Sequence, residues 1–189
     1  MDASESGIDD AGLARAKRIK ELDATGNANI RTVVPFARSL RKLFAGNICG
    51  IDDAGLAHAT RIVELNADDN EKIHTVAPFE KSLRRLHARW NCGLSYAGRI
   101  DATNRGPFRG IGDAGLTGAT RIEMLDAGGN PSIRTLAPFA LSLRKLNASG
   151  WACGIDDTAL AQVMRVVSLD ARDNTNISTP ATRIAVLRR

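Results

Sequence analysis

Three cysteines, Cys49, Cys92 and Cys153, are the residues of this chain best suited to bind a metal or to act as nucleophiles. A structural zinc site needs about four converging cysteine or histidine ligands. The chain has no Cys-x-x-Cys pair, and the three cysteines recur at equivalent places in similar segments. In a regular repeat fold, the three cysteines would therefore lie in a row and would not converge on one metal ion. We interpret them as buried structural thiols and predict no metal site.

Acid–base chemistry would need carboxylates or histidines that face one another. Three adjacent aspartate pairs recur at the same place in the repeated segment: Asp9-Asp10, Asp52-Asp53 and Asp156-Asp157. Adjacent side chains point in different directions, and one member of each pair precedes an apolar turn in the manner of a helix N-cap. The histidines have no serine or cysteine nucleophile placed beside them; they are His58, His74 and His87. We predict that the protein is not an enzyme, with no catalytic residue and no cofactor.

The composition is that of a folded soluble protein. The chain has 189 residues, of which 43% are hydrophobic and 25% charged, and its net charge is +5. A disordered chain would be less hydrophobic, a membrane-spanning helix needs about 20 apolar residues in a row, and three cysteines make no disulfide framework. The first residues, 1–6, are acidic and small, unlike a secretory signal or a transit peptide. We expect a cytoplasmic protein without membrane contact.

Internal repetition is the main signal in the sequence. A seven-residue segment begins at Gly7, Gly50, Gly110 and Gly154, with successive offsets of 43, 60 and 44 residues. Each unit divides again into segments of 21 to 23 residues, which begin at Ile19, Leu40, Ile62, Leu83, Ile122, Leu143 and Val166. In every segment the fourth residue is leucine and the sixth is alanine, while the ninth is asparagine in the odd-numbered segments. Self-similarity at fixed spacing predicts a repeat architecture.

These columns resemble the L-x-x-L-x-L-x-x-N-x-x-I pattern of leucine-rich repeats over about residues 7–180. The even segments, with Cys-Gly-Ile-Asp-Asp-x-Gly-Leu, resemble the cysteine-containing subtype that is often attached to F-box proteins. The resemblance implies one right-handed α/β solenoid domain over residues 1–189, with seven or eight repeats, a parallel sheet on the concave face and a basic C-terminal end at 181–189. Repeats of that subtype commonly select substrates for ubiquitin ligases, but no recognisable F-box precedes Gly7.

Short helical turns should join the strands on the convex side. In one kind of turn we expect an aspartate N-cap, at Asp10, Asp53, Asp113 and Asp157. In the other kind we expect a threonine cap, at Thr32, Thr75 and Thr135, with a proline in the first turn, at Pro35, Pro78 and Pro138. The 60-residue offset contains about 17 extra residues, roughly 94–110. They are interpreted either as a shortened relic repeat, with Ala102 in the alanine column, or as a looped-out insertion.

The most informative surface is the expected concave face. Acidic and basic residues alternate along its third column, at Glu21, Lys42, Glu64 and Arg85. Parallel neighbours lie about 4.8 Å apart, so these side chains should form a ladder of alternating charge. Tryptophan and arginine are favoured in binding hot spots, and the candidate protein-binding residues are Phe44, Arg84, Arg85, His87, Arg89 and Trp90. Trp90 has two interpretations, as a binding anchor or as a residue tucked under the irregular segment that follows it.

The leading functional hypothesis is a non-enzymatic protein-binding scaffold or adaptor, because repeat stacks present extended concave surfaces. A second hypothesis is a structural component that assembles end to end, since Gly7 begins within a repeat without a polar cap and open ends expose strand edges. Similar regular arrays are encoded by large amoeba-infecting viruses and their hosts. A third is binding to nucleic acid or another anionic surface through the basic excess. We disfavour it because nine basic residues meet nine acidic residues on the expected concave face.

Overall fold

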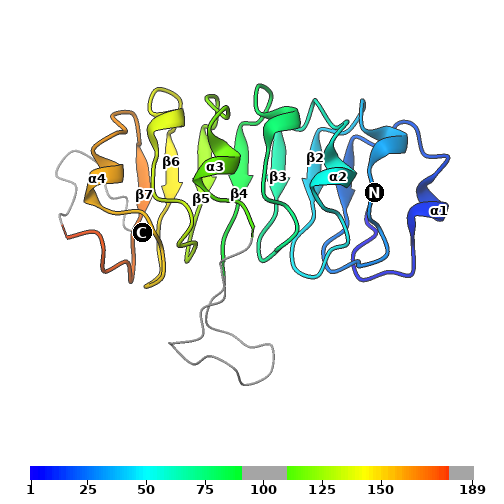
Figure 1. The fold of residues 1–189 in the computed structure, drawn as a ribbon, viewed down its shortest axis with the longest axis horizontal. Helices are drawn as coiled ribbons and strands as arrows, with labels where there is room; N and C mark the ends of the chain where they lie inside the picture. The colour runs from blue at the N-terminus through cyan, green and yellow to red at the C-terminus, as the bar shows by residue number, and fades with distance from the viewer. Residues whose placement is uncertain (91–109, 179–189) are drawn as a thin grey trace, which may run out of the picture.

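The protein is a solenoid that adds one β-strand with each turn. The computed structural model describes residues 1–90 and 110–178. Its seven strands form one sheet in chain order, and each is parallel to its neighbours (Figure 1). This arrangement confirms the predicted solenoid and its parallel sheet.

Two kinds of short helix alternate between the strands. The strands are β1 (Glu21–Asp23), β2 (Lys42–Phe44), β3 (Glu64–Asn66), β4 (Arg85–His87), β5 (Met124–Asp126), β6 (Lys145–Asn147) and β7 (Ser168–Asp170). The α-helices are α1 (Asp10–Leu13), α2 (Asp53–Leu56), α3 (Asp113–Leu116) and α4 (Asp157–Leu160), and the 3-10 helices are η1 (Val34–Phe36), η2 (Ala77–Phe79) and η3 (Ala137–Phe139). Within the described residues, no helix is long and apolar enough to cross a membrane.

The core lies on one side of the sheet and is built from the repeated columns. Leucines of the fourth column are buried from Leu22 to Leu146, and alanines of the sixth column are buried from Ala24 to Ala148. Three phenylalanines of the 3-10 helices complete the core: Phe36, Phe79 and Phe139. Because successive side chains of a strand point to opposite faces, the third and fifth columns face away from this core.

The two aspartates of each pair have different structural roles. Asp52 is the N-cap of α2 and accepts a hydrogen bond from the backbone N–H of Gly55 at 2.8 Å. Asp53 accepts hydrogen bonds from the backbone N–H groups of His74 and Thr75 in the next turn, at 2.9 and 3.2 Å. Equivalent bonds to the following turn are made by Asp10, Asp113 and Asp157. The prediction that Asp53 caps the helix is therefore wrong by one position. The cap is Asp52, and Asp53, the first helical residue, binds the backbone of the neighbouring repeat.

The threonines lie one residue away from the N-caps of the 3-10 helices. Their hydroxyl oxygens accept hydrogen bonds from the backbone N–H two residues later, at Thr32, Thr75 and Thr135. The N-cap positions themselves hold apolar residues without a side-chain cap, Val33, Val76 and Leu136. The predicted prolines do lie in the first turn of each 3-10 helix.

The strands on either side of the long offset, β4 and β5, are neighbours in the sheet. These two strands pair directly, with Leu86 opposite Leu125. The interpretation of the extra residues, as a relic repeat with Ala102 in the alanine column or as a looped-out insertion, stays a prediction. Residues 91–109, which hold most of the extra segment and Cys92, lie outside the described residues.

Residues 1–3 cover the outer edge of β1. Asp2 forms a parallel bridge with Asp23. The backbone N–H of Ala3 donates to the carbonyl oxygen of Asp23 at 2.8 Å, and the N–H of Asp23 donates to that of Met1 at 3.0 Å. The expectation of an uncovered strand edge before Gly7 is wrong, because these residues complete the hydrogen bonding of β1.

Candidate functional site

The sheet face that points away from the core carries the predicted charge ladder. Lys42 Nζ lies 3.8 Å from Glu21 Oε2 and 4.0 Å from Glu64 Oε2, on the two neighbouring strands. Glu64 Oε2 also lies 3.3 Å from Arg85 Nη1. The strand register places these four residues opposite one another, which confirms the prediction. Each exposed pair contributes up to about 1 kcal/mol, so the ladder mainly balances the charge of this face from β1 to β4.

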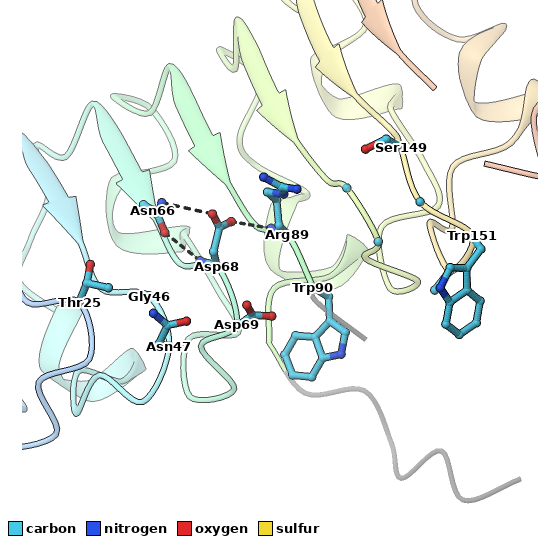
Figure 2. Close-up of a pocket in the computed structure, with 14 residues that line it drawn as sticks. Thr25, Gly46, Asn47, Asn66, Asp68, Asp69, Arg89, Trp90, Ser149 and Trp151 are labelled. Atoms are coloured by element: carbon cyan, nitrogen blue, oxygen red, sulfur yellow. Dashed lines mark hydrogen bonds between the residues drawn. The ribbon is translucent and has the colours of Figure 1, made fainter. Parts of the chain in front are cut away.

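An open groove of about 510 Å³ lies beyond the carboxyl ends of the strands (Figure 2). All strands are parallel, so their carboxyl ends share one edge of the sheet. The groove runs along this edge from Thr25, which follows β1, to Ala152, which follows β6. The groove is lined by large aromatic side chains together with charged groups.

Asp68 provides a half-buried carboxylate in the groove. Its Oδ1 accepts a hydrogen bond from the backbone N–H of Arg89 at 2.7 Å, and its Oδ2 accepts one from Asn66 Nδ2 at 3.3 Å (Figure 2). Burial raises the pKa of this carboxyl above its ordinary value, and the negative charge of nearby Asp126 raises it further. The hydrogen bond from Arg89 acts in the opposite direction.

A second carboxylate, Asp126, lies beside the basic residues of β4. Arg89 Nε is 3.7 Å from Asp126 Oδ1, and His87 Nδ1 is 3.9 Å from Asp126 Oδ2. The backbone N–H of Gly128 donates to Asp126 Oδ1 at 3.2 Å. Asp68 thus binds the backbone of Arg89, while Asp126 pairs with its guanidinium.

The two tryptophans of the chain both line this groove (Figure 2). Trp90 follows β4 and Trp151 follows β6, while the turn after β5 contributes Gly128 and Gly129 between them. Two strand spacings separate the tryptophan-bearing turns, about 10 Å. The glycines have no side chain, so the floor between the two indoles is backbone.

Trp90 packs against the protein on one side and lines the groove on another. The indole lies against Gly110, where an added Cβ would be 3.7 Å from Cζ3 of the ring. Gly110 is the first described residue after the irregular segment. The ring is therefore half-buried and at the same time lines the groove.

The predicted binding residues separate into two groups along the strands. Arg89 and Trp90 line the groove, and Phe44 and His87 are the last residues of β2 and β4, close to the same edge. Phe44 and His87 are not neighbours, because Asn66 of β3 lies between them in the sheet.

Arg84 and Arg85 lie farther back along the same strand. Arg85 begins β4 and belongs to the charge ladder. Arg84 precedes β4, at the amino edge of the sheet, where its Nε is 3.3 Å from Glu123 Oε1. It lies six residues before Trp90, a stretch of chain that can span at most about 20 Å. The two arginines therefore belong to surfaces other than the groove.

Trp151 is the groove residue that sequence reasoning missed. The residue is 54% exposed. Trp151 lies one position later in its segment than Trp90 does in the preceding even segment. The signal was present, since the sequence has two tryptophans and both follow an even strand. Trp151 is the ninth residue of its segment, beyond the columns expected on the concave face.

The other residues singled out for chemistry lie apart from one another. Cys49 and Cys153 are both buried, and burial raises the pKa of the Cys49 thiol. His74 Nδ1 lies 3.1 Å from Asp53 Oδ2 on the helical side of the solenoid, whereas His58 is exposed elsewhere. The described residues contain no group of three histidine, cysteine or acidic side chains with metal-binding geometry.

Comparison with solved structures finds an internalin (InlF) of Listeria monocytogenes strain 4b F2365, with a TM-score of 0.53 and 18% sequence identity. The fold is a leucine-rich-repeat solenoid. The match covers 89% of this leucine-rich-repeat chain but 52% of the internalin, so the chain spans about half the length of that structure. No family model matches the chain, and no curated protein sequence matches it.

Proposed function

We propose that this leucine-rich-repeat protein is a non-enzymatic scaffold that binds a protein partner across the outer face of the sheet and the groove at its carboxyl edge. The tryptophan pair carries the proposal. Trp90 and Trp151 line one groove from two different repeats, with a glycine floor between them. Large aromatic side chains flanked by polar groups are the usual anchors of protein interfaces.

The surroundings of the two indoles support a protein ligand. Arg89 and Asp68 offer a guanidinium and a carboxylate on the same edge, held by the bonds to Asp126 and Asn66. The charge ladder leaves the adjoining face from β1 to β4 nearly neutral, so a partner needs no strong charge of its own to approach it. Leucine-rich repeats stack into extended surfaces of this kind.

Two further parts of the proposal concern the cellular compartment of the protein and the subtype of its leucine-rich repeats. A role as a cytoplasmic adaptor is supported by the free thiol of Cys49, because thiols persist in reducing compartments. The equivalent burial of Cys49 and Cys153 supports the cysteine-containing subtype. The ubiquitin-ligase role that this subtype would imply stays a prediction, as does end-to-end assembly.

The experiment compares partner capture by the wild type and by the Trp90→Ala/Trp151→Ala variant. The matched control is Leu141→Ala/Met164→Ala, which removes two apolar side chains that are 77% and 92% exposed outside the groove. A partner captured by the wild type and the control should be lost by the groove variant. With the purified partner, affinity should fall at least about 30-fold, as expected for hot-spot anchors.

Both variants should give the same circular dichroism spectrum as the wild type, which shows that they are folded. A groove variant that is folded and retains every partner with unchanged affinity would overturn the proposal. Light scattering of the wild type alone separates assembly from partner binding. Oligomers that grow with concentration and persist in the groove variant would favour the end-to-end component instead.

A further inference from the structure

A row of arginines follows the amino edge of the sheet, opposite the groove. The odd turns each place one arginine three residues before the strand, at Arg18, Arg61, Arg121 and Arg165. The even turns each place one directly before the strand, at Arg41, Arg84 and Arg144. All seven turns with a strand therefore contribute an arginine to the same edge. We refer to these seven residues as the arginine edge.

The basic excess of the protein is concentrated there. The segments that lead into the seven strands are 14–20, 37–41, 57–63, 80–84, 117–123, 140–144 and 161–167. They hold twelve lysines and arginines but two carboxylates, Glu80 and Glu123. The excess of ten positive charges is twice the net charge of +5 of the whole chain, so the rest of the protein is net negative. The charge balance of the sheet face, on which nucleic acid was disfavoured, included Arg41, Arg84 and Arg144 but not the four arginines of the odd turns.

Few of these cations are neutralised within the described residues. Arg84 pairs with Glu123, and none of the other arginines of the edge lies within 4 Å of a carboxylate in the described part of the chain. Arg121 Nη1 and Arg165 Nη1 donate to the backbone carbonyls of Lys81 and Leu141 on neighbouring turns, at 3.5 and 3.3 Å. These bonds orient the guanidiniums along the edge without cancelling their charge.

The spacing of the row suits a polymer of phosphates. Neighbouring strands are about 4.8 Å apart, so seven arginines extend over about 29 Å. Duplex nucleic acid carries one negative charge per about 1.7 Å of its axis, which supplies several phosphates along this length. Arginine binds phosphate with two parallel hydrogen bonds. A rigid sheet holds the row in place before the ligand arrives.

We propose that the arginine edge binds the phosphate backbone of double-stranded nucleic acid without sequence preference, a second binding surface separate from the groove. A membrane of anionic lipid shares the phosphate chemistry but is favoured less. The cations form one narrow row, and exposed apolar side chains on this edge are confined to the last two turns, at Leu141, Met164 and Val167. A duplex presents phosphates in lines, which matches a row.

The test uses fluorescence anisotropy of a labelled 30-base-pair DNA duplex with the wild type at 50 and 200 mM NaCl. Six or more phosphate contacts predict a loss of affinity of about a thousandfold between these salt concentrations. The edge variant carries Arg18→Gln, Arg61→Gln and Arg144→Gln, whose side chains are exposed and make no hydrogen bond or ion pair in the described residues. The control carries Arg31→Gln, Lys72→Gln and Arg134→Gln, an equal loss of charge away from the amino edge.

The edge variant should bind the duplex at least about tenfold more weakly than the control at 50 mM NaCl, and its salt slope should fall by about three. Equal weakening in both variants would overturn the proposal, because it would show a response to net charge alone. Absence of duplex binding by the wild type at 50 mM NaCl would overturn it as well. Cosedimentation with phosphatidylserine vesicles in that case would assign the edge to membranes. These results are independent of partner capture by the groove.

Discussion

Asn70 donates a hydrogen bond from Nδ2 to the backbone carbonyl of Ala45, 25 residues earlier in the chain, at 2.7 Å. The same nitrogen donates to the carbonyl of Ile51 at 3.3 Å, and Oδ1 accepts from the backbone N–H of Lys72 at 2.8 Å. The side chain is 2% exposed. Equivalent bonds to the preceding turns are made by Asn27, Asn130 and Asn174. The asparagine of each odd segment thus provides hydrogen-bond partners for backbone groups that are buried between its own turn and the preceding one.

Replacing Asn70 with alanine should destabilise the solenoid by at least about 2 kcal/mol, because each buried backbone group left without a partner costs about 1 to 3 kcal/mol. The control is Asn29→Ala, at an exposed residue whose side chain makes no hydrogen bond in the described part of the chain. Urea unfolding followed by circular dichroism gives the midpoints. Equal midpoints for the two variants would show that water replaces the amide without penalty.

The sequence predicted the features that recur with the period of the solenoid. The leucine and alanine columns identify the strands because each turn must bury the same stripe against its neighbours. The charge ladder followed from the same register, since Glu21, Lys42, Glu64 and Arg85 occupy one column. Equivalent positions become neighbours in a solenoid, so their contacts can be derived before the structure.

Features that break the period or depend on side-chain direction could not be predicted in this way. Both aspartates of a pair have cap-forming chemistry, and only the backbone conformation shows that Asp52 caps the helix while Asp53 reaches the next turn. Arg84 and Trp90 belong to one segment, but strand length places them at opposite edges of the sheet. The groove depends on Trp151, which lies outside the strand columns that were compared.

The glycines of the α-helices are packing positions, and α2 offers a direct test. A Cβ on Gly55 would lie 2.1 Å from the carbonyl oxygen of Arg31 in the preceding turn. At the equivalent Gly12 of α1, the nearest such contact is 3.5 Å, to Ile8 Cγ2. The fourth helix carries Ala159 at this position, which shows that a turn can shift to accept a methyl group. We therefore expect Gly55→Ala to cost about 1 to 3 kcal/mol.

Gly12→Ala is the matched control for Gly55→Ala and should be neutral or stabilising by up to about 1 kcal/mol, because alanine has the higher helix propensity. Thermal unfolding followed by circular dichroism measures both variants under the same conditions. An increase in melting temperature for Gly55→Ala would contradict the close approach of α2 to the backbone of Arg31.

The raised pKa of Asp68 makes the stability of the groove dependent on pH. Burial and the charge of Asp126 give the carboxyl a higher pKa in the folded protein than its ordinary value of 3.8. The folded state therefore binds this proton more tightly than the unfolded state does. The contribution of Asp68 to stability is most favourable below pH 3.8 and declines as the pH rises through the folded pKa, where the buried carboxylate becomes charged.

Asp68→Asn removes this charge and retains an oxygen that can accept the hydrogen bond from the backbone N–H of Arg89. The variant should be more stable than the wild type at pH 7, and the difference should shrink towards zero at pH 3, where Asp68 is protonated in both states. Urea midpoints at pH 3, 5 and 7 measure the difference, with the exposed Asp173→Asn as the control. A destabilised variant at pH 7, or a difference that does not change with pH, would show that the carboxylate is stabilised by its partners more strongly than it is penalised by burial.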